Sequence, residues 1–152
     1  MTGATLTDGA RALGIELTTE QVSRLVRHLD LMDEWGARMN LTAIRDREQQ
    51  LTKHVLDSLS VRPWLRGERV ADLGSGGGFP GLVLAALRPD LDMTLIEADA
   101  RKAAFLGEAG RRMGLKKPPR VVISRIEDAP GSQADVVTAR ALTPLRQLLS
   151  WA

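Results

Sequence analysis

The chain has 152 residues, of which 43% are hydrophobic and 26% charged, with a formal net charge of +2 at pH 7. This length suffices for one globular domain with its own core. The absence of cysteine excludes disulfides, Cys-ligated zinc and a cysteine nucleophile, and we expect no metal centre. No apolar run is long enough to span a membrane, and no secretory signal is recognisable. We therefore expect a cytoplasmic protein without membrane contacts.

Basic and acidic side chains are unevenly distributed along the chain. Residues 1–67 carry nine of each, whereas residues 101–146 carry ten basic and four acidic side chains. Such an excess fits an anionic partner, with nucleic acid as the leading candidate, although a merely solvated basic face explains it equally well. The candidate phosphate contacts are Arg101, Lys102, Arg111, Arg112, Lys116, Lys117 and Arg125.

The first 67 residues show helical patterns only. Residues 5–13 predict a short helix that Gly14 ends. Thr18 and Gln21 have the spacing of a capping box, and apolar residues recur at helical intervals from there to Trp35.

A third helix is predicted further along, with Asp46 as its N-cap, Leu51, Val55 and Leu59 on its apolar face, and Pro63 at its end. Residues 40–42 interrupt the pattern before it and predict a loop.

From Arg69 onward, strand patterns alternate with helical ones. The candidate strands are residues 69–73, 93–97, 121–124 and 135–139, and the candidate helices are residues 81–87, 101–113 and 144–151. This alternation predicts right-handed crossovers and a mainly parallel sheet. We expect residues 1–67 to form a helical cap on a Rossmann-like α/β region, residues 68–152, in one compact unit.

Five glycines lie within the eight residues from Gly74 to Gly81, between the first strand and its helix. Such a loop lets a ligand approach backbone N–H groups at the start of a helix. Pro80 suits the first turn of that helix, where its missing N–H has no intrahelical partner. The stretch predicts a nucleotide-type cofactor site, the alternative being an ordinary glycine-rich turn.

Three acidic residues lie at or near successive strand ends: Asp72, Glu97 and Glu127. In an open parallel sheet, ligands bind beyond the carboxyl ends of the strands. Glu97 stands where a carboxylate can accept both hydroxyls of a ribose. The three acids favour a cofactor that contains adenosine.

Two cofactors compete for the glycine loop. Residues 76–81 satisfy the G-x-G-x-x-G pattern of nicotinamide dinucleotides. However, Asp72 would repel a pyrophosphate and would suit the ammonium group of S-adenosylmethionine (AdoMet), while Pro80 lacks an N–H for an anion. The pattern from Asp72 through Gly74 and Gly76 therefore favours AdoMet.

Several short motifs together resemble the RsmG (GidB) family of bacterial 16S rRNA methyltransferases, which modify N7 of one guanosine. They are Asn40-Leu41-Thr42, residues 53–58 (KHVLDS), the glycine loop, Ser124-Arg125-Ile126-Glu127 and Ala139-Arg140-Ala141. The resemblance implies a class I methyltransferase fold and a 16S rRNA substrate, in the small ribosomal subunit or its precursor. It also implies AdoMet contacts at Gly74, Phe79, Ile126, Glu127 and Arg140, with Glu97 on the ribose.

The chain departs from the family pattern at its end. The family's sheet has seven strands, and this sequence stops after the fourth strand and its helix. We expect a truncated sheet whose fourth strand is an edge, which invites self-association. One alternative function is therefore a catalytically impaired fragment that still binds AdoMet or RNA, and another is a nicotinamide-dependent oxidoreductase.

Arg140 follows the fourth strand at the mouth of the expected cleft. We expect it to contact the cofactor or to orient the guanosine, a surface salt bridge being the alternative. Asn40, His54 and Asp57 are expected to line the cleft from the cap, where a structural hydrogen bond is as good an interpretation as a substrate contact. No general base is required, because guanine N7 already carries a lone pair, and positioning supplies the rate.

Overall fold

A four-stranded parallel sheet organises the protein. The computed structural model describes residues 2–129, 133–140 and 144–151. The strands are β1 (Arg69–Leu73), β2 (Asp92–Glu97), β3 (Arg120–Ile123) and β4 (Val136–Ala139), in the order β3-β2-β1-β4. Every neighbouring pair is parallel. The predicted strands are confirmed, with their bounds shifted by at most one residue.

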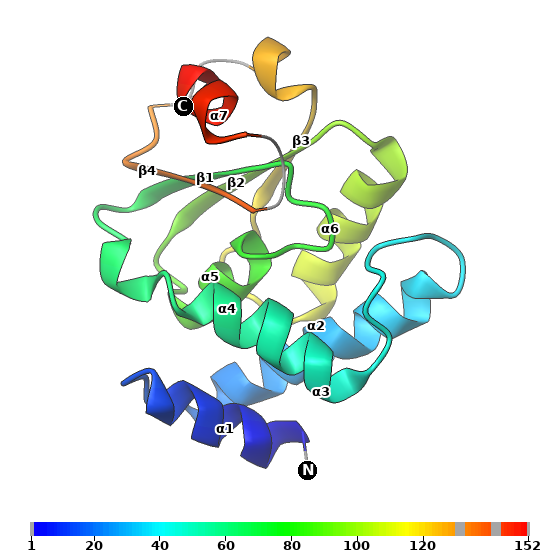
Figure 1. The fold of residues 1–152 in the computed structure, drawn as a ribbon, viewed down its shortest axis with the longest axis vertical. Coiled ribbons are helices and arrows are strands. Elements are labelled where there is room, and N and C mark those ends of the chain that lie inside the picture. Colours follow the sequence, from blue (N-terminus) through cyan, green and yellow to red (C-terminus); the bar gives the residue numbers. More distant parts are fainter. Residues whose placement is uncertain (1, 130–132, 141–143, 152) are drawn as a thin grey trace.

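The helices are α1 (Thr2–Ala12), α2 (Thr19–Gly36), α3 (Arg47–Gln50), α4 (Asp57–Leu59), α5 (Gly81–Leu87), α6 (Ala100–Arg112) and α7 (Leu145–Trp151). A π-helix, η1 (Leu51–Leu56), joins α3 to α4, and short 3₁₀ turns occupy η2 (Arg62–Trp64) and η3 (Ile126–Asp128). Figure 1 shows α5 and α6 beneath the sheet, α2 and the α3–α4 run beneath those two helices, and α1 outermost. Beside β4, α7 lies on the other side of the sheet.

The cap begins where its sequence signals predicted. Thr18 Oγ1 accepts the Gln21 N–H at 3.1 Å, and Gln21 Oε1 accepts the Thr18 N–H at 2.8 Å, which completes the capping box of α2. Asp46 caps α3 by accepting the Gln49 N–H at 2.9 Å. The expectation that Pro63 ends this helical run is wrong. The run ends at α4, and Pro63 lies inside η2, because proline is tolerated in the first turn of a helix.

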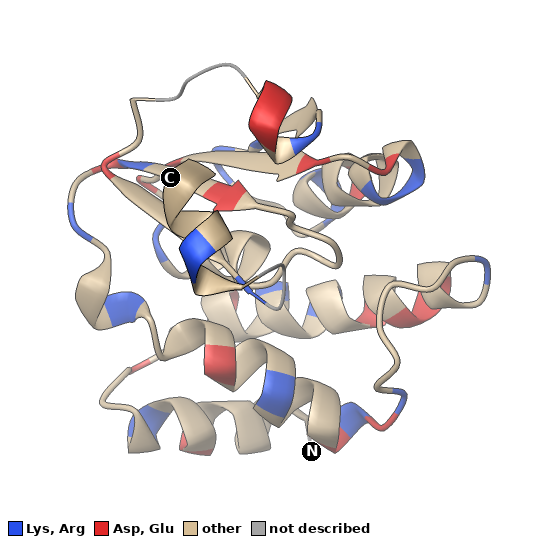
Figure 2. Ribbon diagram, turned by 45° about the horizontal axis from the view of Figure 1, so that its top comes forward, with Lys and Arg blue, Asp and Glu red and all other residues tan. Residues whose placement is uncertain are grey.

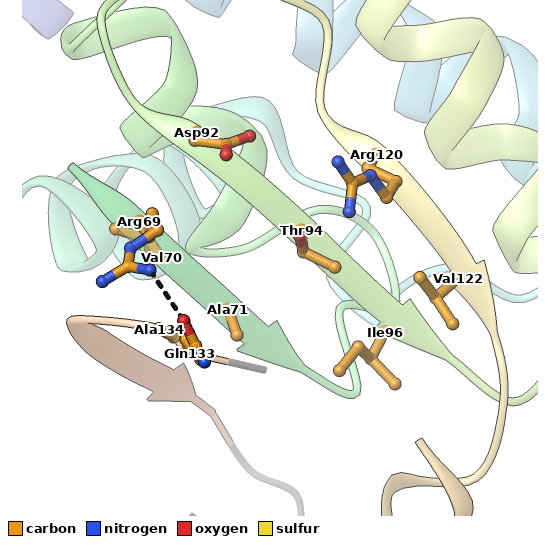
Figure 3. Close-up of a pocket in the computed structure, with 10 residues that line it drawn as sticks. All are labelled: Arg69, Val70, Ala71, Asp92, Thr94, Ile96, Arg120, Val122, Gln133 and Ala134. Carbon is orange, nitrogen blue, oxygen red and sulfur yellow. Dashed lines mark hydrogen bonds between the residues drawn. The ribbon is translucent and has the colours of Figure 1, made fainter. Parts of the chain in front are cut away.

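One hydrophobic core includes residues of both the cap and the sheet region. Leu25, Leu29 and Leu59 from the cap are fully buried, as are Leu82 and Leu95 from the α/β region. Side chains along β2 point alternately to the two faces of the sheet. The face opposite to Leu95 is less covered by other elements. A hollow of about 300 Å³ lies on that face. Figure 3 shows Ala71, Thr94 and Ile96 among the residues that line it.

The sheet has β3 and β4 at its edges within the described part of the chain. β4 pairs only with β1 there, so self-association through β4 remains a prediction. No helix among the described residues is long and apolar enough to cross a membrane.

Candidate functional site

The glycine loop follows β1 and uses its glycines in two ways. Gly74 and Gly76 have φ of 65° and 54°, the left-handed region that glycine adopts without strain. A Cβ on Gly76 would meet nothing nearer than 3.9 Å, so the loop faces open space there. By contrast, a Cβ on Gly77 would lie 2.9 Å from the Met32 sulfur, and one on Gly81 would lie 2.7 Å from Asp72 Oδ2. The loop is thus packed tightly against the protein on one side and open on the other.

Asp72 lies beneath this loop and is fully buried. Its Oδ1 accepts the Thr138 hydroxyl at 2.8 Å, and its Oδ2 accepts the Gly81 N–H at 3.2 Å. Burial raises the pKa of the Asp72 carboxyl to about 6, against the hydrogen bond from Thr138. Asp72 therefore connects the base of the loop to β4 and to the start of α5. Its contact with an ammonium group remains a prediction.

Glu97 lies at the carboxyl end of β2, directly beside the loop. Its Oε1 accepts the Gly76 N–H and its Oε2 accepts the Asp99 N–H, both at 2.9 Å. Each carboxylate oxygen keeps a second acceptor position. The backbone thus orients the Glu97 side chain, while its contact with a ribose remains a prediction.

Phe79 packs against two imidazoles from the cap. Its ring stacks on His28 with centroids 4.5 Å apart and on His54 with centroids 4.7 Å apart. His28 Nε2 lies 2.7 Å from the Gly77 carbonyl oxygen, which can only accept, so Nε2 carries the proton. Burial lowers the pKa of His28 to about 4, against this hydrogen bond. The cap therefore holds the glycine loop through a neutral histidine.

Arg140 connects β4 to the cap. Its Nη1 donates to the Lys53 carbonyl oxygen at 2.9 Å, and its Nη2 lies 2.8 Å from His54 Nδ1. The guanidinium also lies 3.5 Å from the Asp57 carboxylate and 5.4 Å from the Phe79 ring centroid. The structure thus brings His54, Asp57 and Arg140 together, and the ion pair with Asp57 is a contact of the kind that the alternative for Arg140, a surface salt bridge, expects.

The contact with Arg140 determines the tautomer of His54. A guanidinium has donors only, so Nδ1 must accept. Burial first, and the charge of Arg140 second, lower the pKa of His54 to about 4, so the ring is neutral and its single proton is on Nε2. That nitrogen lies 2.8 Å from Thr42 Oγ1, to which it donates. With both nitrogens engaged, His54 is not available as a general base.

A cavity of about 140 Å³ lies where these groups meet. It is bounded by the 41–42 loop of the cap, the glycine loop and the residue after β4. Its lining residues are Leu41, Thr42, His54, Gly74, Ser75, Gly76, Gly77, Phe79 and Arg140. The cavity opens at the carboxyl end of the sheet, where open α/β sheets bind ligands.

The predicted cofactor residues Ile126 and Glu127 are not among the residues that line this cavity. Ile126 and Glu127 lie in η3, three and four residues beyond β3, whose end pairs with Glu97 in the neighbouring strand. Asn40 precedes the cavity-lining pair Leu41 and Thr42 but does not itself line the cavity. Ala141, the last residue of the predicted motif at Arg140, lies outside the described residues.

The predicted phosphate contacts divide into two groups. Arg111 pairs with Glu108 at 2.7 Å and Arg112 with Glu34 at 2.8 Å, so carboxylates balance their charges. The side chains of Arg101, Lys102, Arg125, Lys116 and Lys117 form no ion pair within the part of the chain that the structure describes. Figure 2 shows basic and acidic segments interspersed along the helices in that view, without a face of one sign.

Sequence reasoning did not single out His28 or Thr138, and it named Thr42 only within the Asn40-Leu41-Thr42 motif. His28 occurs on the apolar face of α2, between Leu25 and Met32. A histidine at such a position in the helical pattern was the sequence signal that could have identified it. Thr138 and Thr42 reach the site only through tertiary contacts, which a single sequence does not reveal. No cluster of metal-ligating residues occurs among the described residues.

A parallel sheet with helices on its face, a glycine loop after the first strand and an acid after the second define a Rossmann-like methyltransferase fold. Family comparison agrees with this class. The family described as rRNA small subunit methyltransferase G matches residues 21–152. The chain belongs to this family.

Named relatives in bacteria are similar to the chain over most of its length. It is 41% identical over 144 residues to the ribosomal RNA small subunit methyltransferase G of Neisseria gonorrhoeae, covering 94% of this chain and 69% of the relative. It is 45% identical over 137 residues to the protein of that name from Gluconobacter oxydans, covering 90% and 69%. The corresponding protein of Psychromonas ingrahamii is 41% identical over 138 residues, covering 90% and 66%. The chain thus spans about two thirds of these relatives.

Proposed function

We propose that the protein transfers a methyl group from AdoMet to N7 of a guanosine in 16S rRNA, in the cytoplasm, in the small ribosomal subunit or its precursor. The observation that carries the proposal is the cavity between the open side of the glycine loop and the Thr42, His54 and Arg140 side chains. Family membership favours methyl transfer over hydride transfer. The relatives' shared name supports rRNA as the substrate.

The residues present fit AdoMet. Gly76 leaves space above the loop, since a Cβ there would meet no atom nearer than 3.9 Å. The Glu97 carboxylate, oriented by two backbone N–H groups, would hold the ribose hydroxyls. The further proposed contacts, which the family resemblance implies, are Gly74, Phe79, Ile126, Glu127 and Arg140.

Methyl transfer to guanine N7 requires the protein mainly to position the methyl donor and the guanine relative to each other. When bound, AdoMet supplies a methyl group on a positively charged sulfur, and guanine N7 supplies the lone pair that displaces it. The protein must align the two and exclude competing nucleophiles, and alignment alone contributes several kcal/mol, roughly 7–11 in favourable cases. Neither histidine is placed to act as a base, because both ring nitrogens of His54 are hydrogen-bonded and His28 is fully buried.

Arg140 is proposed to orient the substrate or cofactor. It lines the cavity and is held by Lys53, His54 and Asp57, so its charge is fixed in one place. Arg101, Lys102 and Arg125 are proposed to contact RNA phosphates. Binding through them should lose affinity linearly in log salt, and a flat salt response would remove these three residues from the proposal.

The test has two stages. Calorimetric titration with AdoMet, with NADH as the control ligand, should show binding of AdoMet alone. Incubation with methyl-labelled AdoMet and 16S rRNA that lacks the modification should then give 7-methylguanosine at one position by nucleoside analysis. A folded chain that binds no AdoMet refutes the cofactor assignment. Binding without transfer supports the alternative of a module that binds AdoMet or RNA but lacks catalysis.

A matched pair of variants tests Arg140. Arg140→Lys keeps the charge but cannot reach both the Lys53 carbonyl and His54 as a planar fork does. We expect methyl transfer to fall at least about 10-fold while circular dichroism stays unchanged, as for loss of a charge-assisted contact. Arg66→Lys, at an exposed loop position, is the control and should leave transfer unchanged. Equal rates for the two variants would contradict a role for Arg140.

A further inference from the structure

The hydroxyl group of Thr42 has both of its acceptor positions occupied. Thr42 Oγ1 accepts the Ile44 N–H at 3.1 Å and the His54 Nε2–H at 2.8 Å. The direction of the second bond follows from Arg140, which forces His54 Nδ1 to accept and leaves the ring proton on Nε2. A hydroxyl has two acceptor sites and one donor. The Thr42 O–H is therefore left to donate, and no acceptor for it occurs among the residues that the structure describes.

That donor belongs to the cavity at the glycine loop, since Thr42 is one of its lining residues. Thr42 is half-buried, so its O–H can donate to an acceptor that enters the cavity. The arrangement is thus satisfied when a ligand places an acceptor in the cavity.

Two further donors line the same cavity. The Gly77 N–H has no acceptor within the described ranges, whereas its neighbours Gly76 and Gly78 donate to Glu97 and Ser75. The Arg140 guanidinium donates one N–H each to Lys53 and His54 and has three more. Ser75 is different, because its hydroxyl already donates to the Asp72 carbonyl at 3.1 Å.

No Asp or Glu side chain is among the residues that line this cavity. They present the unused Thr42 and Gly77 donors together with the Arg140 guanidinium, which also pairs with the Asp57 carboxylate outside the lining at 3.5 Å. A ligand group with negative charge and several acceptor oxygens is complementary to such a lining, and charge-assisted hydrogen bonds are the strong ones. A volume of about 140 Å³ suits a small planar anion.

We propose that Thr42, with the Gly77 N–H and Arg140, binds the carboxylate of the amino-acid part of the methyl donor. The assignment rests on the proposed function, and it identifies Thr42 as a cofactor-binding residue supplied by the cap. In this assignment the carboxylate occupies the cavity, and Glu97, on the other side of the loop, binds the adenosine part. An RNA phosphate in this cavity is the competing occupant that the experiment must separate.

The test uses binding rather than turnover. Calorimetry compares AdoMet with decarboxylated AdoMet, which lacks only the carboxylate, on the wild-type chain and on Thr42→Val, Thr42→Ser and Thr7→Val. Thr42→Val should weaken AdoMet by about 10- to 100-fold, the range for a hydrogen bond to a charged group. The affinity for decarboxylated AdoMet should change less than about 3-fold, because that ligand makes no use of the contact.

The two other variants are the matched controls. Thr42→Ser keeps the hydroxyl and should retain the preference for AdoMet. Thr7→Val makes the same change in α1, outside the cavity lining, where the threonine hydroxyl already donates to the Gly3 carbonyl at 2.9 Å, and it should retain the preference too. Circular dichroism and thermal unfolding confirm that each variant is folded.

Each remaining outcome decides a different question. Wild-type chain that binds neither ligand refutes the proposed function itself. Wild-type chain that binds AdoMet while Thr42→Val binds it equally well refutes the role of Thr42 alone. If Thr42→Val lowers the affinity for both ligands equally, Thr42 has a purely structural role and the assignment is overturned. Unchanged AdoMet binding with weakened RNA binding assigns the cavity to a phosphate and overturns it as well.

Discussion

His28 makes the stability of the fold depend on pH in a direction that the structure determines. The imidazole is fully buried, stacks on Phe79 and donates to the Gly77 carbonyl. Burial lowers its pKa from 6.5 to about 4. In the unfolded chain it takes up a proton near pH 6.5, whereas in the folded chain it stays neutral until about pH 4. The unfolded state therefore binds more protons in this window, and stability falls as the pH falls.

The magnitude follows from the two pKa values. At pH 7.5 both states are neutral at His28, and the residue adds no pH dependence. At pH 5 the unfolded state is mostly protonated and the folded state is not, which costs about 2 kcal/mol, rising to about 3 kcal/mol near pH 4. Asp72 acts in the opposite sense, because its raised pKa makes the folded state the better proton acceptor between about pH 6 and 3.8. The pH dependence of wild-type stability therefore does not isolate the contribution of His28. The wild-type chain must be compared with a variant that lacks this imidazole.

The perturbation is His28→Gln, whose amide N–H can still donate to the Gly77 carbonyl but which does not titrate. Urea unfolding at pH 7.5, 6 and 5 gives the free energy of unfolding of both proteins. We expect the variant to be less stable at pH 7.5, because it loses the stacking on Phe79. Between pH 7.5 and 5 it should lose about 2 kcal/mol less than the wild-type chain does.

A second measurement checks the same reasoning without a variant. The chain has two histidines, and burial lowers the pKa of both to about 4. Neither imidazole resonance should therefore titrate between pH 8 and 5.5 in an NMR experiment on the folded chain. A resonance that titrates near pH 6.5 and disappears in His28→Gln, or parallel pH profiles for the two proteins, would refute the argument.

Three further predictions concern the loop and its supports. Gly81→Ala should lower the free energy of unfolding by about 1–3 kcal/mol, because the new Cβ would crowd Leu95 and the Asp72 carboxylate; its control, Gly107→Ala, meets no atom within 4 Å on the exposed side of α6 and should raise it by up to about 1 kcal/mol. Thr138→Val should cost about 2 kcal/mol at pH 8 and less at pH 5, where Asp72 becomes neutral and the lost hydrogen bond is weaker, and equal costs at both pH values would contradict the assignment. Thr18→Ala should cost about 1 kcal/mol through loss of the α2 N-cap, measured by thermal unfolding against Thr52→Ala, an exposed helical threonine, as the reference.

The strands could be predicted from the sequence because each combines an apolar run with a clear boundary. Residues 69–73 end at a glycine loop, and residues 121–124 follow two prolines, so local chemistry determines where pairing starts and stops. The start of α2 was equally local, since its capping box needs only Thr18 and Gln21. The end of the third helix could not be predicted from neighbouring residues in this way. Its π-helical segment depends on packing, and Pro63 sits in a separate turn instead of ending the run.

The candidate site was predictable only where chain neighbours create it. The glycine loop and Glu97 follow from the strand–loop–helix pattern, because parallel strands place their carboxyl ends together. The burial of Asp72 was not visible in the sequence, where an acid at a strand end suggests exposure to ligand. Its partner Thr138 lies 66 positions away, and the two meet only because β4 pairs with β1 in register. Long-range pairing of this kind is information that periodicity does not carry.

The same long-range contacts make the cap part of the proposed cofactor site. His28 holds the Gly77 carbonyl, Met32 fills the space beside Gly77, and Phe79 packs on histidines from two different helices. A glycine loop has many accessible conformations, and fixing it costs conformational entropy at each residue. Here that cost is offset by contacts from the cap rather than by the sheet alone. A substitution in α2 that touches no ligand should therefore still change cofactor affinity, because it changes how often the loop has the shape that the ligand needs.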